Sequence, residues 1–447
     1  MLSGIVKLAD INDFIMPNQE CVKNILNNNK KNVTKINLFD CLACNGCLTS
    51  SETILIKEHS LQKHFDFLQK EKKKISIACI SNQSLESLNF YFKIDYKNIL
   101  KIICKILKID FIFTLEDFIY FTLNLVFDEI NNNKLILFCS ECPGWTFYAQ
   151  KKIGKNIINH LSKIKSPQQI FSIIIREKIK NFVNNCFDDV YICSIASCFD
   201  KKIESIQNKN EINCVLSTIE LVDKIKDEIE NFDFNFEFKN YFTFENFENL
   251  LENFKINNNN NNNNIENLIK YLIENNNNST FYSPIYLFKN NYSSNNYIEF
   301  MIYKITSENK NFYIERKKGK NKDFNEILIY DSEKKENLIK KFCIAYGFRN
   351  IQKLVNDFKN NKLNYDFIEI MACPGGCING GGQIRENNQN RELLNYVNSK
   401  IDEKKIFDFN NKNNNILFNF IYKNNFDKNI FYQKFKEIEF SMSDLQW

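Results

Sequence analysis

The stretch MACPGGCINGGGQ, Met371–Gln383, gathers glycine in a chain that has little of it. It contains five of the eleven glycines in 447 residues, together with Cys373 and Cys377. Glycine has no side chain and tolerates positive φ, so its backbone can approach a bulky ligand and turn sharply around it. Backbone N–H groups in such a loop can also offset negative charge on the ligand. We interpret this stretch as a loop that surrounds a cysteine-bound anionic group.

Apolar runs that end at a cysteine-bearing turn occur three times. They are Asn133–Trp145, Asp188–Ser205 and Tyr365–Cys377. Four other segments also have recognisable patterns. We predict a strand followed by a helix in Lys72–Leu88, and a buried helix running into a strand in Ile99–Phe113. Two further helices are predicted, in Ser166–Phe182 and Glu336–Phe358. Strands that alternate with helices predict an α/β fold with mostly parallel sheets. Such sheets bind ligands beyond the carboxyl ends of their strands, so we expect one site formed by Cys142, Cys198, Cys373 and Cys377.

A second cysteine group precedes this core. CLACNGC supplies Cys41, Cys44 and Cys47, and Cys21 is the one other cysteine before Cys79. Three thiolates in a tight loop plus a remote fourth are typical of a cubane iron–sulfur cluster. Zinc also accepts four thiolates, but structural zinc sites usually pair two C-x-x-C units, and here only a triple and a single are present. The spacing therefore favours an iron–sulfur cluster over zinc.

Composition limits the possible functions. The net charge of +5 and the lack of a dense basic stripe give no case for nucleic-acid binding. The apolar runs are shorter than the roughly 18 residues of a membrane span, and the N-terminus does not resemble a signal peptide. A reducing compartment then makes metal or redox chemistry the expected use of clustered cysteines.

Residues outside the two cysteine groups have simpler expected roles. The three histidines, His59, His64 and His160, are expected at the surface or in packing, which argues against Cys/His metal sites. The remaining cysteines are interpreted as small buried apolar residues: Cys79, Cys104, Cys139, Cys186, Cys193, Cys214 and Cys343.

We predict three regions: an N-terminal iron–sulfur segment over 1–70, an α/β core over 71–400 and a C-terminal segment over 401–447. Within the core, the asparagine-rich stretch 257–279 is expected to be a disordered surface insertion, because such tracts bury little apolar surface.

Three segments resemble the signature motifs of iron-only ([FeFe]) hydrogenases: ECPGW (Glu141–Trp145), SCFDKKIE (Ser197–Glu204) and EIMACPGGCINGGGQ (Glu369–Gln383). The resemblance covers roughly residues 74–400. It implies a core of two α/β lobes with mostly parallel sheets. It also implies that Cys142, Cys198, Cys373 and Cys377 hold the cubane of the family's active site.

The segment DCLACNGCLTSSE (Asp40–Glu52) is similar to the eukaryotic hydrogenase-like proteins of the nuclear prelamin A recognition factor-like family. That family includes cytosolic iron–sulfur protein assembly factors. The resemblance implies two [4Fe–4S] clusters, no two-iron subcluster and no hydrogen turnover. It further implies a cytoplasmic protein, with the nucleus as a second location, that relays clusters from cytosolic scaffold proteins to the targeting complex for cytosolic and nuclear apoproteins.

Departures from true hydrogenases support this branch. Glu141 stands where they have a proton-transfer cysteine, Ala196-Ser197 replaces Met-Pro before Cys198, and Ile384 replaces the proline after the third motif. We expect Lys201, a charged residue of the second motif, near the place of the missing subcluster. An active hydrogenase, and a protein that binds a prenylated nuclear-envelope tail, remain the alternatives.

The chain ends in SDLQW. A terminal tryptophan can act as an anchor, with its ring in a pocket and its carboxylate on a cation. Leu445, Gln446 and Trp447 resemble the C-terminal tripeptide that docks on the β-propeller subunit of the cytosolic targeting complex. An ordinary terminus is the alternative.

Overall fold

The structure is a computed structural model, and the chain divides into two units, Met1–Thr53 and Ile54–Trp447. It describes residues 59–70, 75–133, 135–180, 190–207, 211–233, 239–257, 265–276, 297–308, 312–319, 321–332, 334–384, 392–393, 396 and 427–436. The predicted N-terminal ligands Cys21, Cys41, Cys44 and Cys47 lie outside the described residues, as do Cys186, Leu445, Gln446 and Trp447.

The first sheet has four parallel strands in the order β2-β1-β4-β5. They are β1 (Ile75–Ile80), β2 (Phe111–Thr114), β4 (Val190–Ala196) and β5 (Cys214–Ser217). Nearly every residue of these strands is buried, as expected for a parallel sheet that is covered on both faces. The predicted parallel α/β arrangement is therefore confirmed.

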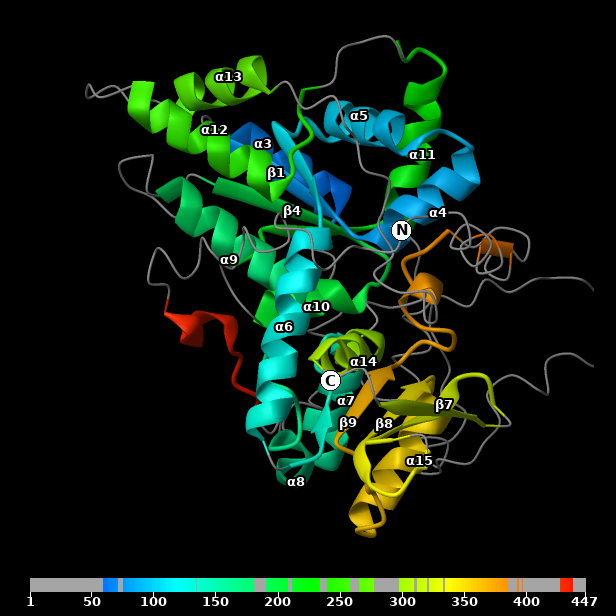
Figure 1. The fold of residues 1–447 in the computed structure, drawn as a ribbon. Coiled ribbons are helices and arrows are strands. Elements are labelled where there is room, and N and C mark those ends of the chain that lie inside the picture. The colour runs from blue at the N-terminus through cyan, green and yellow to red at the C-terminus, as the bar shows by residue number, and fades with distance from the viewer. Residues whose placement is uncertain are drawn as a thin grey trace, which may run out of the picture. The chain divides into compact units, whose positions relative to one another are not determined.

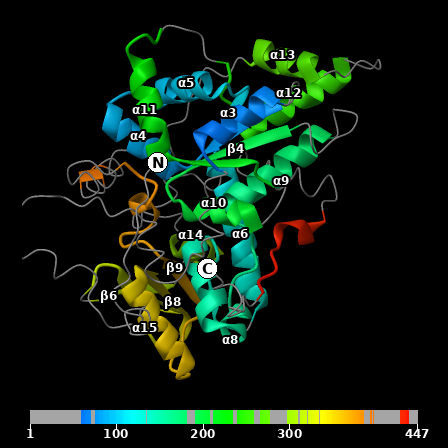
Figure 2. The same ribbon diagram turned by 180° about the vertical axis from the view of Figure 1, so that it is seen from behind.

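Helices cover both faces of this sheet (Figures 1 and 2). Side chains alternate along each strand, so Ile77 belongs to one core and Ala78 to the other. The helices on the Ala78 side are α3 (Leu61–Lys70), α4 (Asn82–Phe92), α5 (Tyr96–Leu107) and α11 (Thr218–Ile229). Those on the Ile77 side include α6 (Glu116–Asn132), α9 (Pro167–Lys180), α12 (Phe244–Asn257) and α13 (Ile265–Asn275).

The second sheet is mixed, with the order β3-β9-β8-β7-β6. Its strands are β3 (Leu137–Phe138), β6 (Tyr313–Lys318), β7 (Phe324–Tyr330), β8 (Leu338–Tyr346) and β9 (Phe367–Met371). β3, β9 and β8 run parallel to one another, whereas β7 pairs antiparallel with both of its neighbours, β8 and β6. The helices α7 (Pro143–Tyr148), α8 (Lys155–Ile158), α14 (Tyr297–Glu308) and α15 (Phe348–Lys359) accompany it. Two sheets with their own helices confirm the two-lobed α/β fold.

The prediction of one helix over Glu336–Phe358 is wrong. The first part is strand β8, and α15 starts only at Phe348. Gly347 separates them with φ +81°, a conformation that glycine adopts readily and that interrupts a helix. The run Phe342–Tyr346 is buried between neighbouring strands, so its apolar character reflects a strand and not a helix face.

The asparagine-rich stretch 257–279 also differs from the expectation. Its central part forms helix α13, in which Leu268 and Leu272 are fully buried in the core. These leucines are four residues apart and lie on one helix face, which packs with α12. Apolar periodicity inside the stretch therefore outweighs the asparagine runs on either side of it.

Replacing Leu272 by alanine should destabilise the protein by about 2–5 kcal/mol, because a buried side chain is removed and a cavity is left. Urea unfolding of the full chain measures this loss. Lys270→Ala is the control, because Lys270 lies on the same helix with its side chain 72% exposed. Equal stability of the Leu272 variant and the wild type would show that α13 does not pack as described.

The boundary expected at residue 70 falls too late. Helix α3 packs on the core through Leu61, Phe65 and Leu68, and its His64 is 1% exposed. The C-terminal region also contributes, because Phe431 is fully buried and Tyr432 pairs with Ile164. The core therefore includes segments on both sides of the predicted range 71–400.

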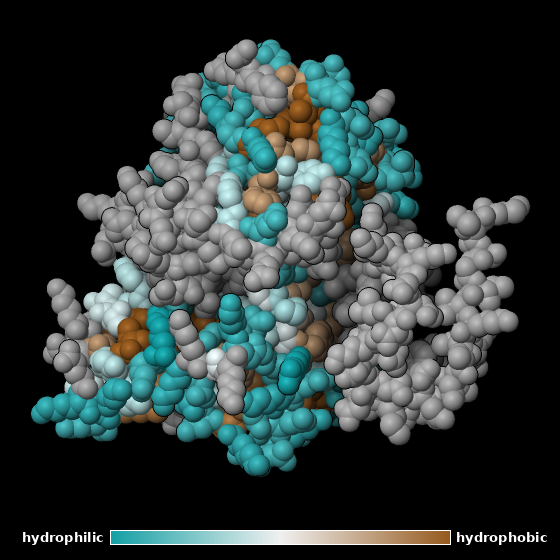
Figure 3. Space-filling view, turned by 90° about the vertical axis from the view of Figure 1, so that its right-hand side faces the viewer, coloured by the Kyte–Doolittle hydropathy of each residue, from teal (hydrophilic) through white to brown (hydrophobic). Residues whose placement is uncertain are grey.

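Hydrophilic residues dominate the described surface in the view of Figure 3, with apolar groups visible between them. Across the described part of the chain, the large apolar side chains that are exposed are Leu135, Ile219, Leu338, Ile339 and Tyr432. No described helix is both long and apolar enough to span a membrane.

Candidate metal centre

Cys142 lies at the junction of a strand and a helix. It follows the loop after β3 and is the N-cap residue of α7, where Pro143 occupies the first turn. Its backbone carbonyl accepts hydrogen bonds from the N–H groups of Trp145 (3.1 Å) and Thr146 (3.0 Å). Its thiol accepts one from the N–H of Ala372 at 3.3 Å. The sulfur is thus held against the segment that follows β9.

Cys373 and Cys377 lie in the glycine-rich loop after β9. This strand is the parallel neighbour of β3, with Leu137 beside Phe367. The carboxyl ends of the two strands therefore bring Cys142 and Cys373 to the same edge of the sheet. Cys377 opens a short 3-10 turn (Cys377–Asn379), and its thiol contacts Met371 Sδ at 3.7 Å.

Cys198 comes from the other sheet. It follows β4 and precedes α10 (Asp200–Gln207). The glycine-rich loop reaches across to it, because the N–H of Gly382 donates to Ser197 O at 2.9 Å. The thiol of Cys198 also lies close enough to that of Cys373 to interact with it.

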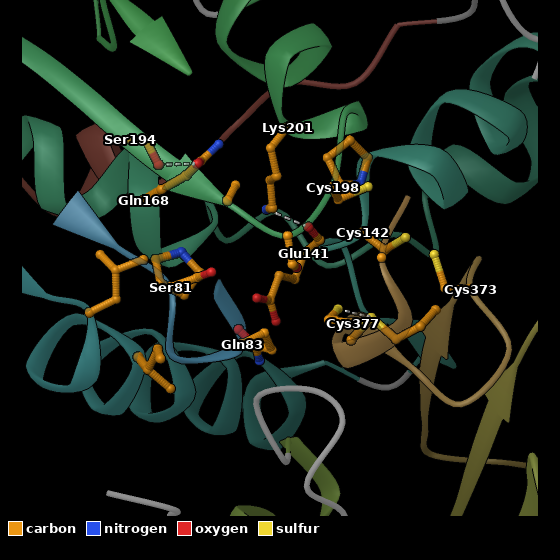
Figure 4. A pocket seen from close by; sticks show the side chains of 18 residues that line it. Ser81, Gln83, Glu141, Cys142, Gln168, Ser194, Cys198, Lys201, Cys373 and Cys377 are labelled. Carbon is orange, nitrogen blue, oxygen red and sulfur yellow. Dashed lines mark hydrogen bonds between the residues drawn. The ribbon is translucent and has the colours of Figure 1, made fainter. Parts of the chain in front are cut away.

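All four cysteines line one pocket, as the strand-end argument predicts. In Figure 4 they lie to the right, with Ser81 and Gln83 of the first lobe to the left. Cys142 is 8% exposed, and the other three thiols are partly buried. Four thiols from three segments of the two lobes therefore converge on a protected space.

The glycines of this loop have two distinct uses. Gly375 and Gly376 adopt φ +72° and +82°, which side chains disfavour. A Cβ on Gly380 would lie 2.2 Å from Ser197 O, and one on Gly382 would lie 2.8 Å from Ser217 Cβ. We expected the missing side chains to make room for a ligand. At Gly380 and Gly382 they make room for the backbone and side chains of the other lobe.

A polar network forms the wall beside the cysteines. Lys201 Nζ donates to the backbone carbonyl of Glu141 at 2.8 Å and to Glu204 Oε1 at 3.2 Å. Glu204 Oε2 accepts from Ser166 Oγ at 2.8 Å and also from Gln168. Gln168 in turn accepts from Ser194 Oγ at 2.8 Å. Lys201 thus lies in the wall of the cysteine pocket.

Burial controls the charges in this wall. It raises the pKa of the Glu141 carboxyl to about 7, partly opposed by Lys201. It raises the pKa of Asp200 to about 6. Burial also opposes the charge of Lys201, but Glu204 and Glu141 outweigh it and raise the pKa of that ammonium. The pocket wall therefore presents one stable cation close to the cysteines.

The four thiols also have raised pKa values where a shift is resolved. Burial raises the pKa of Cys142 to about 12 and that of Cys377 well above its usual range. Interaction with Cys373, together with burial, raises the pKa of the Cys198 thiol well above its usual range. Thiolates at this place therefore need a positive partner, which a bound metal supplies.

The donor set fits an iron–sulfur cubane. Four thiolates suit such a cluster or zinc, and both take soft sulfur ligands. The Ala372 N–H at Cys142 and the Lys201 ammonium offer partial and full positive charge near those sulfurs. We therefore keep Cys142, Cys198, Cys373 and Cys377 as the predicted cluster ligands.

Sequence reasoning overlooked part of this site. No pattern in the sequence singles out Gln168, Ser194 or Asp200, although Gln168 lies in the predicted helix Ser166–Phe182 and Asp200 in the second motif. A buried polar network has no fixed spacing, so no pattern indicates it. Cys139 was expected to be a core residue close to Cys142, and at 1% exposure it is one.

Three proteins that are similar in sequence over most of their length are named as cytosolic Fe-S cluster assembly factors or probable ones. The chain is 32% identical over 419 residues to the probable cytosolic Fe-S cluster assembly factor Bm6838 of Brugia malayi, covering 86% of this chain and 84% of the relative. It is 28% identical to the probable factor oxy-4 of Caenorhabditis elegans (86% and 84%). It is 27% identical to the factor narfl of Xenopus tropicalis (88% and 87%).

Solved structures show the same fold. The [FeFe]-hydrogenase HydA1 of Chlamydomonas reinhardtii superposes with a TM-score of 0.60 at 16% identity, covering 85% of this chain and 99% of that one. Residues 109–381 match the family described as "Iron only hydrogenase large subunit, C-terminal domain". This matched range is more than half of the chain and contains the four converging cysteines. The chain therefore belongs to the iron-only hydrogenase-like family.

Proposed function

We propose that this protein is a cytosolic iron–sulfur protein assembly factor that holds two [4Fe–4S] clusters and relays clusters from cytosolic scaffold proteins to the targeting complex, without hydrogenase activity. The observation that carries the proposal is the pocket in which Cys142, Cys198, Cys373 and Cys377 converge. The names of the relatives support the assembly role and the cytosolic location.

Within the core, the residues have separate tasks. The four cysteines would hold a [4Fe–4S] cluster, which supplies a stable anionic iron–sulfur unit. The N–H of Ala372 and the ammonium of Lys201 stabilise charge on the sulfurs. The loop around Gly380 and Gly382 holds the two lobes together, because its backbone bonds to Ser197, the neighbour of Cys198.

Departures from the hydrogenase motifs support the lack of hydrogenase activity. Glu141 stands where true hydrogenases have a proton-transfer cysteine, and Ala196-Ser197 and Ile384 replace residues of the second and third motifs. A buried carboxyl with a raised pKa can still move protons, so this part of the proposal does not rest on Glu141 alone. Lys201 lines the pocket but belongs to the second motif, which resembles that of hydrogenases, so it does not distinguish the two functions.

The N-terminal cluster and the C-terminal docking motif belong to the proposal as well. Cys21, Cys41, Cys44 and Cys47 would hold the second cluster, and Leu445, Gln446 and Trp447 would dock on the β-propeller subunit of the targeting complex. The spacing of the cysteines supports the first and the terminal tryptophan the second. Removing Trp447 should abolish co-purification with that subunit. Unchanged co-purification would contradict the docking proposal.

Incorporation of labelled iron tests the assembly role. In cells depleted of their own factor, this protein should restore iron incorporation into a cytosolic iron–sulfur enzyme. Incorporation into a mitochondrial iron–sulfur enzyme is the control and should not depend on it. No rescue by the intact, cluster-loaded protein would contradict the proposal. Hydrogen evolution, with infrared bands of iron-bound carbon monoxide or cyanide, would favour a hydrogenase instead. Binding to a farnesylated peptide without rescue would favour a tail-binding protein.

A further inference from the structure

A second group of metal-binding side chains lies away from the predicted cluster site. His64 of α3, Cys193 of β4 and Cys214 of β5 have ligand atoms that all lie within 4.8 Å of one another. Cys193 and Cys214 are direct neighbours in the register of the two parallel strands. Figures 1 and 2 both show α3 beside this part of the sheet. Three residue types suited to metal binding thus meet from three different elements.

The group is buried. His64, Cys193 and Cys214 are 1%, 0% and 3% exposed, within the core formed by α3, α4, α5 and α11. A buried cysteine is commonly a small apolar residue, as Cys79 on the other face of the sheet illustrates. A buried imidazole differs, because its two nitrogens must find partners in the core. Burying the histidine therefore requires a specific set of partners for its two ring nitrogens.

Hydrogen bonds fix the orientation of His64. Its Nε2 lies 2.9 Å from the backbone carbonyl of Leu107, which can only accept, so Nε2 carries the proton. Its Nδ1 therefore has the free electron pair and accepts from Tyr191 Oη at 2.7 Å. Histidines that bind metals usually donate their other N–H to such a carbonyl. The ring is already arranged as a metal ligand through Nδ1.

Tyr191 adds a fourth donor at the same place. It lies on β4 two residues before Cys193, so both side chains point to the same face of the sheet. Its hydroxyl interacts with Cys214 as well as with His64. The phenolic oxygen thus lies beside the imidazole nitrogen and the Cys214 sulfur of this group.

We propose that His64 Nδ1, Cys193 Sγ, Cys214 Sγ and Tyr191 Oη bind one zinc ion. Zinc prefers four nitrogen and sulfur or oxygen ligands in a tetrahedron, with Zn–S bonds of about 2.3 Å. On binding, Nδ1 gives up the hydrogen bond from Tyr191 Oη, and Tyr191 stays a neutral phenol that turns an oxygen lone pair to the metal. The two thiol protons leave to solvent, and one Zn²⁺ with two thiolates is electrically neutral. A neutral unit suits a dry core better than separate charges.

The proposed site would have a structural role. It ties α3, which precedes the first strand, to β4 and β5. His59 adds a further link, because its Nδ1 accepts from the N–H of Val215 at 3.0 Å next to Cys214. The inference does not depend on the assembly function, because none of its ligands lines the pocket of the four converging cysteines.

Metal analysis of the full chain tests the proposal. Protein purified without air and reconstituted with iron should contain about one zinc per chain. Cys193→Ser and Cys214→Ser should each lower zinc to near zero and leave the iron content unchanged. Cys79→Ser is the matched control, because Cys79 is equally buried on the neighbouring strand β1 but faces the opposite core, and it should retain zinc.

Cobalt substitution keeps the test valid should the serine variants fail to fold. Wild-type protein exchanged with Co²⁺ should show a thiolate-to-cobalt charge-transfer band, and the milder variant His64→Gln should weaken or shift it. Zinc below one-tenth per chain, both as purified and after equilibration with Zn²⁺ under reducing conditions, would overturn the proposal. Zinc that persists in Cys193→Ser would do so too, because it would then sit at another site. A Cys193–Cys214 disulfide in the purified protein, detected by mass, would also overturn it.

Discussion

Replacing Cys373 by serine should reduce the iron content from about eight to about four atoms per chain, because one of two cubanes loses a thiolate ligand. Acid-labile sulfide should fall in parallel. Cys373 follows β9 and lines the pocket with Cys142, Cys198 and Cys377. The structure offers no other thiol in this pocket among the described residues, so no neighbouring cysteine can replace it. Iron and sulfide assays on protein purified without air measure the change.

Cys139→Ser is the control for that experiment. Cys139 lies three residues before Cys142 and is buried, yet it does not line the pocket. This variant should keep its full iron content. Unchanged iron in Cys373→Ser, or loss of half the iron in Cys139→Ser, would show that the ligands are assigned wrongly.

Replacing Gly380 by alanine should both destabilise the protein and lower its iron content. The new Cβ would lie 2.2 Å from Ser197 O, a distance that real contacts do not reach. The loop or the Ser197–Cys198 segment must shift, and overpacking of this kind costs about 1–3 kcal/mol. Because Cys198 follows Ser197 directly, the shift also moves a predicted cluster ligand. Urea unfolding and iron analysis of the same sample test both effects.

Gly381→Ala provides the matched comparison. Gly381 lies between Gly380 and Gly382 and has no positive φ, so alanine there meets no backbone strain. It should behave nearly as the wild type. Equal stability and iron content of the Gly380 and Gly381 variants would contradict the close packing of the two lobes at this loop.

Much of the fold was predictable because the strands that lead into the cysteine pocket are short apolar runs followed by turns that contain cysteine. β4 and β9 end where the sequence predicts, and parallel strands then bring their carboxyl ends together. The cysteine pocket follows from this rule and needs only local patterns. The helix over Glu336–Phe358 failed because an apolar run of five residues fits a strand or a helix equally, and only pairing with β7 and β9 decides.

Other features could not be predicted because they depend on long-range contacts. Cys193 lies 129 residues after His64 in the sequence, and Cys214 lies 150 residues after it. No spacing rule connects residues so far apart. We expected His64 in packing or at the surface, and the two cysteines as apolar core. The fold places them together in that core. The wall of Lys201, Glu204 and Gln168 is unpredictable for the same reason.

The central claim is that this chain holds two [4Fe–4S] clusters as an assembly factor. The most direct test is iron and acid-labile sulfide per chain, on protein purified without air. The account predicts about eight of each. Iron clearly above about eight without matching sulfide would contradict it and indicate a two-iron subcluster. Zinc in place of iron, with no sulfide, would contradict it entirely.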